Sequence, residues 1–324
     1  MRVLFLGGAG MIGSAAAAEA TRRGADVTVV TRSEPRRQPA PGVRALRADV
    51  RDTAALAGVL GGAEFDAVVN WVGFTPDDVR GHPALFDGSA GQYVFISTCS
   101  VFARPVPQLP ITESSPRSQP EFGYPRDKIA CELLLEEAYR SRGFPLTIVR
   151  PFHTYDRTVI PSLAGWTAID RMRRGRPVVV HGDGTSLWSL THSRDFARAF
   201  VPLLGNGHAL GESVNVVSGD VLTWDQIHLA LAAAAGVRRP VLRHAASEAF
   251  GEQVPGWREV LEHDFRHSML FDTAKLRRLV PGFAPEVPFA EGAREVLAHY
   301  DAHPELQVVD PALDRAMDRL LGEA

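Results

Sequence analysis

A glycine-rich turn near the N-terminus constrains the fold most strongly. Three glycines spaced GxxGxxG, within GGAGMIG, follow a short apolar run at residues 3–6 and open an alanine-rich stretch at residues 11–23. A strand, a glycine turn and a helix in this order begin a βαβ unit, and glycine there lets the backbone turn sharply and approach a pyrophosphate. The sequence therefore predicts a dinucleotide site. Its predicted contacts at this turn are Gly7, Gly10, Met11, Ile12 and Gly13.

Short apolar runs recur along the first half of the chain and alternate with helical segments. They lie at residues 27–30, 43–46, 67–72, 93–96 and 146–149. This alternation is typical of parallel strands covered on both faces, so we predict an α/β fold with a Rossmann-type, doubly wound parallel sheet. After Pro151 helical patterns dominate. We predict a dinucleotide-binding domain at residues 1–150, with returning segments near 190–220, and a smaller, mostly helical substrate lobe at 151–324.

Composition excludes several classes of protein. The 324 residues are 45% hydrophobic and 23% charged with a formal net charge of -3, which is ordinary for a folded chain and gives no overall basic field for nucleic acid. The two cysteines, Cys99 and Cys131, are too few for a disulfide framework or a cysteine-based zinc site, and no metal site is predicted. No run of about 18 apolar residues predicts a membrane span. We expect a cytoplasmic protein with a small-molecule partner.

The end of the second predicted strand bears on the choice of cofactor. An acidic residue about 20 positions after the glycine turn favours NAD, and a basic one favours NADP. Here Thr31 and Arg32 occupy that place, with Arg36 close behind, so the sequence favours NADP over NAD. The alternative is that these arginines are solvated and that Glu34 binds the ribose hydroxyls. Asp49, after the third strand, is a candidate for the adenine amino group or, alternatively, the N-cap of the next helix.

Tyr124 and Lys128 carry the predicted chemistry. Four residues apart on a helix, they share one face, a spacing that suits acid-base work on an alcohol or ketone. A phenol with a pKa near 10 needs a neighbouring ammonium, and the cation of a nicotinamide, to act near neutral pH. Upstream, ISTCS places hydroxyl groups at the carboxyl end of a strand, where ligands of open α/β sheets bind.

These motifs together resemble the extended short-chain dehydrogenases/reductases, in the group of NAD-dependent epimerases and dehydratases. The resemblance rests on GGAGMIG, ISTCSVFA, YPRDK, VRPFHTY and GDGTSLWSLTHSRDFARAF, which occur in the family's order. It implies that Thr98 is the hydroxyl of the catalytic triad and Tyr124 the proton donor or acceptor. It also implies that Lys128 supports Tyr124 electrostatically and binds the nicotinamide ribose.

Departures from the family pattern bear on the substrate. Cys99 and Ser100 stand where the sugar dehydratases have an Asp-Glu pair, so the groups that remove water are missing. His153 replaces an asparagine, and Trp188 replaces an arginine that contacts a nucleotide diphosphate in the family. These four residues are candidate substrate contacts, although Cys99 is also explained as a packed residue and His153 as a structural histidine. An aromatic or apolar substrate becomes more plausible than a nucleotide-linked sugar.

Three functions follow from this reading. The leading one is hydride transfer between NADP(H) and a secondary alcohol or ketone, with a sugar-like or natural-product substrate and Tyr124 as acid-base group. The second is an epimerase that works through a transient keto intermediate on a tightly bound cofactor. The third is a non-catalytic cofactor-sensing or RNA-binding protein, as in the chloroplast stem-loop-binding relatives of this superfamily. A homodimer is possible through the helix that carries Tyr124.

A run of arginines at residues 171–176 is a further pattern without an assigned role. It occurs at the end of a predicted helix and suits either a substrate phosphate or the negative end of the helix dipole.

Overall fold

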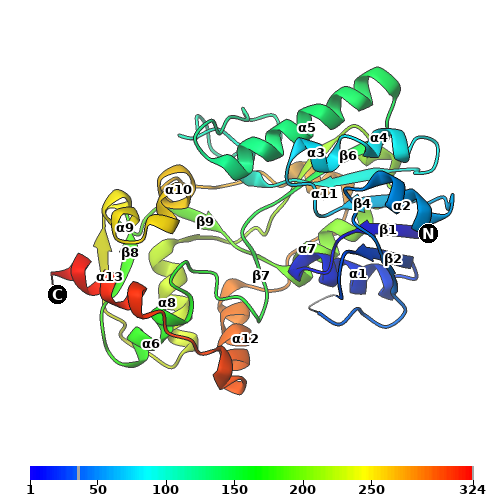
Figure 1. Ribbon diagram of the computed structural model, residues 1–324. Helices are drawn as coiled ribbons and strands as arrows, with labels where there is room; N and C mark the ends of the chain where they lie inside the picture. The colour runs from blue at the N-terminus through cyan, green and yellow to red at the C-terminus, as the bar shows by residue number, and fades with distance from the viewer. Residues whose placement is uncertain (35–36, 323–324) are drawn as a thin grey trace.

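A seven-stranded parallel sheet forms the centre of the N-terminal part (Figure 1). The computed structural model describes residues 1–34 and 37–322. The spatial order of the strands is β11-β6-β5-β4-β1-β2-β3, and every neighbouring pair is parallel. The predicted Rossmann-type α/β fold is thereby confirmed. The strands are β1 (Arg2–Leu6), β2 (Asp26–Thr31), β3 (Arg44–Arg47), β4 (Ala67–Asn70), β5 (Tyr93–Ile96), β6 (Leu146–Pro151) and β11 (Ser213–Val216).

The apolar runs form strands because both faces of the sheet are covered. In β1, Val3 and Phe5 enter one core and Leu4 and Leu6 enter the other, and all four side chains are fully buried. The first core is closed by α1 (Met11–Arg22), α7 (Ser193–Phe200) and α11 (Ala274–Leu279). The second is closed by α2 (Thr53–Leu60), α3 (Pro76–Val79), α4 (His82–Leu85) and α5 (Gly123–Arg142).

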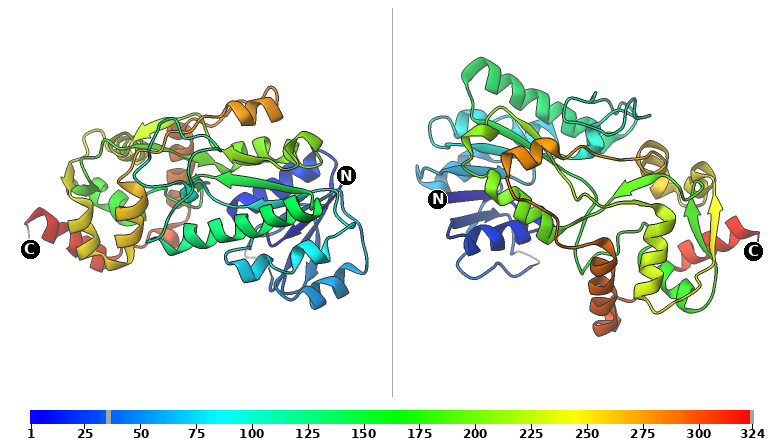
Figure 2. Two further views of the ribbon diagram at one scale, coloured as in Figure 1. Left: turned by 90° about the horizontal axis from the view of Figure 1, so that it is seen from above. Right: turned by 180° about the vertical axis from the view of Figure 1, so that it is seen from behind.

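The C-terminal part lies beside the part that contains the sheet (Figure 2). It packs around an aromatic core that contains Trp188 and Trp224. Its strand pairs are β7 (Thr154–Tyr155) with β10 (Thr191–His192), β8 (Val178–His181) with β13 (Leu242–Ala245), and β9 (Leu187–Ser189) with β12 (Val221–Thr223). Its helices are α6 (Gly165–Arg173), α8 (Trp224–Ala234), α9 (Ser247–Gln253), α10 (Arg258–Val260), α12 (Phe289–Ala302) and α13 (Pro311–Leu321). The chain returns to the sheet twice, through α7 with β11 and through α11. Over residues 1–34 and 37–322, no helix is long and apolar enough to span a bilayer.

Two arginines of the run at residues 171–176, Arg171 and Arg176, bind the last helix. Arg171 is fully buried and donates to Asp314 at 2.6 Å and to Asp318 at 2.9 Å. Arg176 bonds to the same two carboxylates from outside. These contacts attach α13 to the end of α6. Arg173 and Arg174 pair with Asp301 and Asp170, so carboxylates of the chain neutralise the whole run.

Candidate active site

The glycine turn has the backbone conformation that its sequence predicts. Gly7 and Gly8 have φ of +80° and +86°, in the left-handed region that favours glycine. A Cβ at Gly13 would lie 2.4 Å from the carbonyl oxygen of Gly8, so only glycine lets α1 begin this close to the turn. Gly10 is the N-cap of α1 and provides no side-chain cap. The first N–H groups of α1 are therefore not capped by a side chain and suit an anion.

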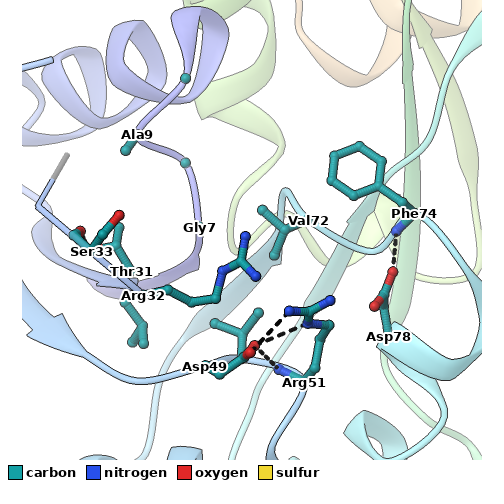
Figure 3. A pocket seen from close by; sticks show the side chains of 14 residues that line it. Gly7, Ala9, Thr31, Arg32, Ser33, Asp49, Arg51, Val72, Phe74 and Asp78 are labelled. Atoms are coloured by element: carbon teal, nitrogen blue, oxygen red, sulfur yellow. Dashed lines mark hydrogen bonds and ion pairs between the residues drawn. The ribbon is translucent and has the colours of Figure 1, made fainter. Parts of the chain in front are cut away.

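A cavity of about 280 Å³ extends from this turn between the ends of β2 and β4 (Figure 3). Asp49 and Arg51 lie in it and form an ion pair at 3.1 Å, and this contact with Arg51 lowers the pKa of Asp49. The N-cap of α2 is Asp52, whose carboxylate accepts from two backbone N–H groups, so the capping alternative for Asp49 is wrong. The other polar residues that line this cavity are Thr31, Arg32, Ser33 and Asp78.

The arginines after β2 have different surroundings. Arg32 lines the cavity and reaches toward Asp49, and Figure 3 shows it facing the same space as Arg51. Arg37 is bonded instead to Asp156 at 2.5 Å and to Thr158 at 2.6 Å. Arg36, also predicted to bind the cofactor, falls outside the described residues. Glu34 is exposed and is not among the residues that line this cavity.

A second cavity, of about 430 Å³, brings the predicted catalytic residues to the glycine turn. Thr98 follows β5, Tyr124 and Lys128 lie on the first turns of α5, and His153 follows β6. Both cavities are lined by Gly8, Gly10, Val72 and Phe74, so together they form one continuous groove. The carboxyl ends of β1, β4, β5 and β6 all reach it, which is where ligands of open α/β sheets bind.

The surroundings of Tyr124 keep its phenol protonated at neutral pH. Burial raises its pKa above the ordinary value of 10, the negative charge of Asp264 raises it further, and the neighbouring Thr98 hydroxyl acts in the opposite direction. The residue keeps 44% of its surface exposed and lines the groove. A phenol in this position can donate its proton, and a ligand oxygen can approach it from the groove.

Lys128 holds a buried positive charge in the same cavity as Tyr124. Its ammonium donates to the carbonyl oxygens of Gly73 at 2.7 Å and Ile96 at 2.8 Å, and it lies 4.9 Å from the ring centres of Phe74 and Phe95. The side chain is only 2% exposed, and burial lowers its pKa to about 8. The group is still mainly cationic at neutral pH, with one N–H left for a ligand.

His153 lines the groove, whereas Trp188 lies behind it. The Trp188 indole N–H donates to Nδ1 of His153 at 2.6 Å, which places the imidazole proton on Nε2. Burial lowers the pKa of His153 to about 4, so the ring is neutral at pH 7 and is a hydrogen-bond donor, not a second acid. His153 also has φ of +26°, a conformation rare for a side-chain-bearing residue. Trp188 is 1% exposed and packs between Phe152 and Phe265.

Cys99 and Ser100 are turned away from the groove. The Cys99 thiol is fully buried and donates to the carbonyl oxygen of Arg150 at 3.2 Å, and burial raises its pKa. This agrees with the alternative that Cys99 is a packed residue. The Ser100 hydroxyl donates to Asp264 at 3.0 Å. Neither residue lines either part of the groove as the described residues form it.

The segment after β4 lines the groove and was missed by the sequence interpretation. Trp71, Val72 and Phe74 line it, and Asn70 holds the segment by accepting from the N–H groups of Val72 and Gly73. No local pattern marks this segment, because its place depends on β4 lying next to β1, so that the carboxyl end of β4 opens beside the glycine turn. Across residues 1–34 and 37–322, no group of three or more His, Cys, Asp or Glu side chains is placed to hold a metal ion.

Comparison with known proteins now identifies the family. The model of the NAD dependent epimerase/dehydratase family matches residues 3–217. The chain belongs to this family. It thereby belongs to a group of NAD(P)-dependent enzymes, as its resemblance to extended short-chain dehydrogenases/reductases predicts, and its neighbours include epimerases, dehydratases and reductases.

Two curated relatives align over most of the chain. One is the chloroplast stem-loop binding protein of 41 kDa b from Arabidopsis thaliana, 25% identical over 305 residues, with 90% of this chain and 77% of the relative covered. The other is 2'-dehydrokanamycin reductase from Streptomyces kanamyceticus, 26% identical over 289 residues, with 87% and 80% covered.

Solved structures share the fold at lower identity. A dTDP-glucose 4,6-dehydratase from Bacillus anthracis in complex with NAD superimposes with a TM-score of 0.74 at 16% identity, with 94% of this chain and 98% of that chain covered. A UDP-glucose 4-epimerase from Thermotoga maritima, solved with UDP-glucose, has a TM-score of 0.71 at 22% identity, with 93% and 99% covered.

Proposed function

We propose that this family member is an NADP(H)-dependent oxidoreductase that transfers hydride between the dinucleotide and a secondary alcohol or ketone. The observation that carries the proposal is the meeting of Thr98, Tyr124 and Lys128 in one cavity with the glycine turn. This reaction requires a phenol with a proton to give, a hydroxyl beside it and a buried ammonium, and the cavity holds all three.

The groove fits a dinucleotide. The close approach of Gly13 to Gly8, with the α1 N–H groups facing the cavity, suits a pyrophosphate. Asp49 would accept from an adenine amino group. Arg32 and Arg51 would bind the 2'-phosphate that distinguishes NADP from NAD, and Lys128 would bind the nicotinamide ribose through its remaining N–H. The dinucleotide, when bound, supplies or accepts the hydride.

In the reductive direction Tyr124 gives its proton to the carbonyl oxygen of the substrate as the hydride reaches the carbonyl carbon. The product is the alcohol, and the phenolate left behind is stabilised by the Thr98 hydroxyl and by the nearby Lys128 ammonium. Oxidation of the alcohol runs the same steps in reverse. The neutral His153 ring has an Nε2–H free for a second substrate oxygen, which favours a hydroxylated or sugar-like ketone.

Two observations favour a reductase over a dehydratase. Ser100 and Cys99, at the places of the dehydratase acid and base, have their side chains bonded to Asp264 and to the Arg150 carbonyl, away from the groove. A relative that aligns over 87% of this chain is a reductase by name, 2'-dehydrokanamycin reductase. A free keto sugar or similar natural product is therefore the substrate class we propose.

Tyr124→Phe tests the proposal because it removes only the phenolic oxygen. Wild-type protein should consume NADPH in proportion to an added keto sugar, and the variant should be slower by about 100-fold or more with an unchanged Kd for NADPH. Turnover of the same ketone by the variant within about tenfold of wild type would contradict the assignment of Tyr124.

The two other functions make different predictions. An epimerase retains its cofactor, so near-stoichiometric oxidised dinucleotide released by acid and identified by mass spectrometry would favour it. The relative from Arabidopsis thaliana, a stem-loop binding protein that aligns over 90% of this chain, supports RNA binding as a further candidate. That function predicts RNA affinity that Tyr124→Phe leaves unchanged, and no turnover of any ketone.

A further inference from the structure

A buried carboxylate from the C-terminal part contacts the catalytic loop. Asp264 lies in η5 (Leu261–Phe265), a π-helical turn that follows α10. One carboxylate oxygen accepts from the Ser100 hydroxyl at 3.0 Å, and the other accepts from the Arg104 guanidinium at 2.7 Å. The side chains of Arg104 and Asp264 are 4% and 7% exposed, so this ion pair is removed from solvent. π-helical turns within helical segments occur frequently at functional sites.

The contact with Ser100 continues to the catalytic residues. Ser100 lies in η1 (Cys99–Val101), a turn of 3-10 helix whose N-cap is Thr98. The Ser100 backbone N–H donates to the Thr98 hydroxyl oxygen at 3.1 Å. Because that N–H occupies one lone pair of the oxygen, the Thr98 hydroxyl proton is left for another acceptor, and the Tyr124 phenol lines the same cavity as Thr98. Hydrogen bonds thus lead from Asp264 through Ser100 to Thr98, beside Tyr124.

Stability by itself is a weak reason for a buried ion pair at this place. A buried ion pair is often no more stable than well-packed apolar residues of the same size, because both charges lose their hydration. Burial raises the pKa of Asp264, although Arg104 and Ser100 act in the opposite direction. The titratable groups near the cluster include Tyr124, whose pKa the charge of Asp264 raises, and His267, whose pKa burial lowers to about 4 beside Arg104.

We propose that Asp264 is a positioning residue for the catalytic pair: it holds Ser100 and Arg104, and through them it fixes the turn that directs the Thr98 hydroxyl onto Tyr124. The catalytic geometry on the sheet is then completed by a segment from the other part of the molecule. The inference rests on the proposed function, in which Tyr124 is the proton donor. It predicts two separable effects on Tyr124, one through the hydrogen bonds and one through the charge of the carboxylate.

Titration of Tyr124 separates these effects without a substrate. The protein, labelled with ¹³C at the phenolic carbon of tyrosine, is titrated by NMR in saturating NADP+, and Tyr124→Phe assigns the signal. Ser100→Ala keeps the ion pair but removes its link to the turn, so the Thr98 bond to the phenolate weakens and the pKa of Tyr124 rises. Asp264→Asn keeps an acceptor for Ser100 but removes the charge, so the pKa of Tyr124 falls.

Glu262→Gln is the matched control, because it removes a negative charge two residues away that pairs with Arg258. It should leave the titration of Tyr124 unchanged.

If Asp264→Asn fails to fold because Arg104 is left unpaired, the double variant Arg104→Met/Asp264→Asn replaces it. That variant removes both charges, and with them the direct effect of the Asp264 carboxylate on the pKa of Tyr124. The proposal would be overturned if the pKa of Tyr124 in Ser100→Ala and in the folded Asp264 variant both matched the wild-type value. The NMR titration measures the ionisation of Tyr124 and not turnover. Loss of turnover in Tyr124→Phe therefore tests the proposed function separately.

Discussion

Trp188 donates its indole N–H to Nδ1 of His153 across 2.6 Å, from a position that is almost fully buried. This bond fixes which ring nitrogen of His153 faces the groove as a donor. Trp188 therefore acts on the groove through His153 and through packing, instead of lining it.

Trp188→Phe should raise the pKa of His153 from its value of about 4. Burial keeps that pKa low, and the indole N–H makes protonation of Nδ1 harder still. Phenylalanine removes the donor and leaves space beside the ring, so both changes favour the imidazolium. Titration of the His153 signal by NMR, assigned with His153→Gln, measures the effect. An unchanged pKa would show that the indole N–H does not set the protonation of the ring.

Substitutions at Gly10 and Gly13 should separate folding from cofactor binding. A Cβ at Gly10 meets no atom within 4 Å and projects beside the groove, whereas a Cβ at Gly13 meets the backbone of Gly8. Gly10→Ala should keep the wild-type Tm and weaken NADPH binding by about tenfold or more. Gly13→Ala should lose about 1–3 kcal/mol of stability as well. Thermal denaturation and NADPH titration distinguish the two, and equal Tm losses would contradict the geometric argument.

Arg32 should distinguish NADP from NAD. A charge-assisted contact with the 2'-phosphate predicts that Arg32→Ala raises the Kd for NADPH by about 10- to 100-fold. The Kd for NADH should change little, because NADH lacks that phosphate. Arg44→Ala is the matched control, since Arg44 is an exposed arginine on β3 that pairs with Asp26. Fluorescence titration with both dinucleotides measures the ratio, and an equal loss for both would remove Arg32 from the phosphate site.

Lys128 should make cofactor affinity depend on pH. Its pKa is lowered to about 8 by burial, so the ammonium is charged below that pH and neutral above it. The charged form binds the ribose hydroxyls and attracts the phosphates, so the affinity for NADPH should fall as pH rises past about 8. Lys128→Met should bind more weakly and show no such fall. Parallel curves of Kd against pH for the two proteins would assign the titration to another group.

Arg171 should contribute far more to stability than its neighbour Arg173. The Arg171 guanidinium is fully buried between two carboxylates of α13, so Arg171→Met breaks a buried pair and should cost about 3 kcal/mol or more. Arg173 pairs with Asp301 at the surface, and Arg173→Ala should cost less than about 1 kcal/mol. Urea denaturation of the two variants measures both values, and similar losses would show that α13 is held by its apolar face instead.

Local pattern was enough to predict the sheet and to single out candidate groups for proton transfer. The period of the apolar runs and the position of the glycine turn specify parallel strands and a helix start, because both depend on residues close together in the chain. Tyr124 and Lys128 were identified from their spacing, which is a property of one helix. For the same reason the aromatic segment after β4 was missed, since its place in the groove depends on which strand lies next to β1.

Tertiary structure alone decided the partners of each polar group. The sequence by itself determined the Rossmann-type sheet, the glycine turn and the residues available for proton transfer. It did not determine that Asp264 reaches Ser100 across 164 positions, that Arg171 binds α13, or that Trp188 lies behind His153. Those pairings join segments far apart in the chain, and their energies depend on desolvation and distance, which exist only once the chain has packed.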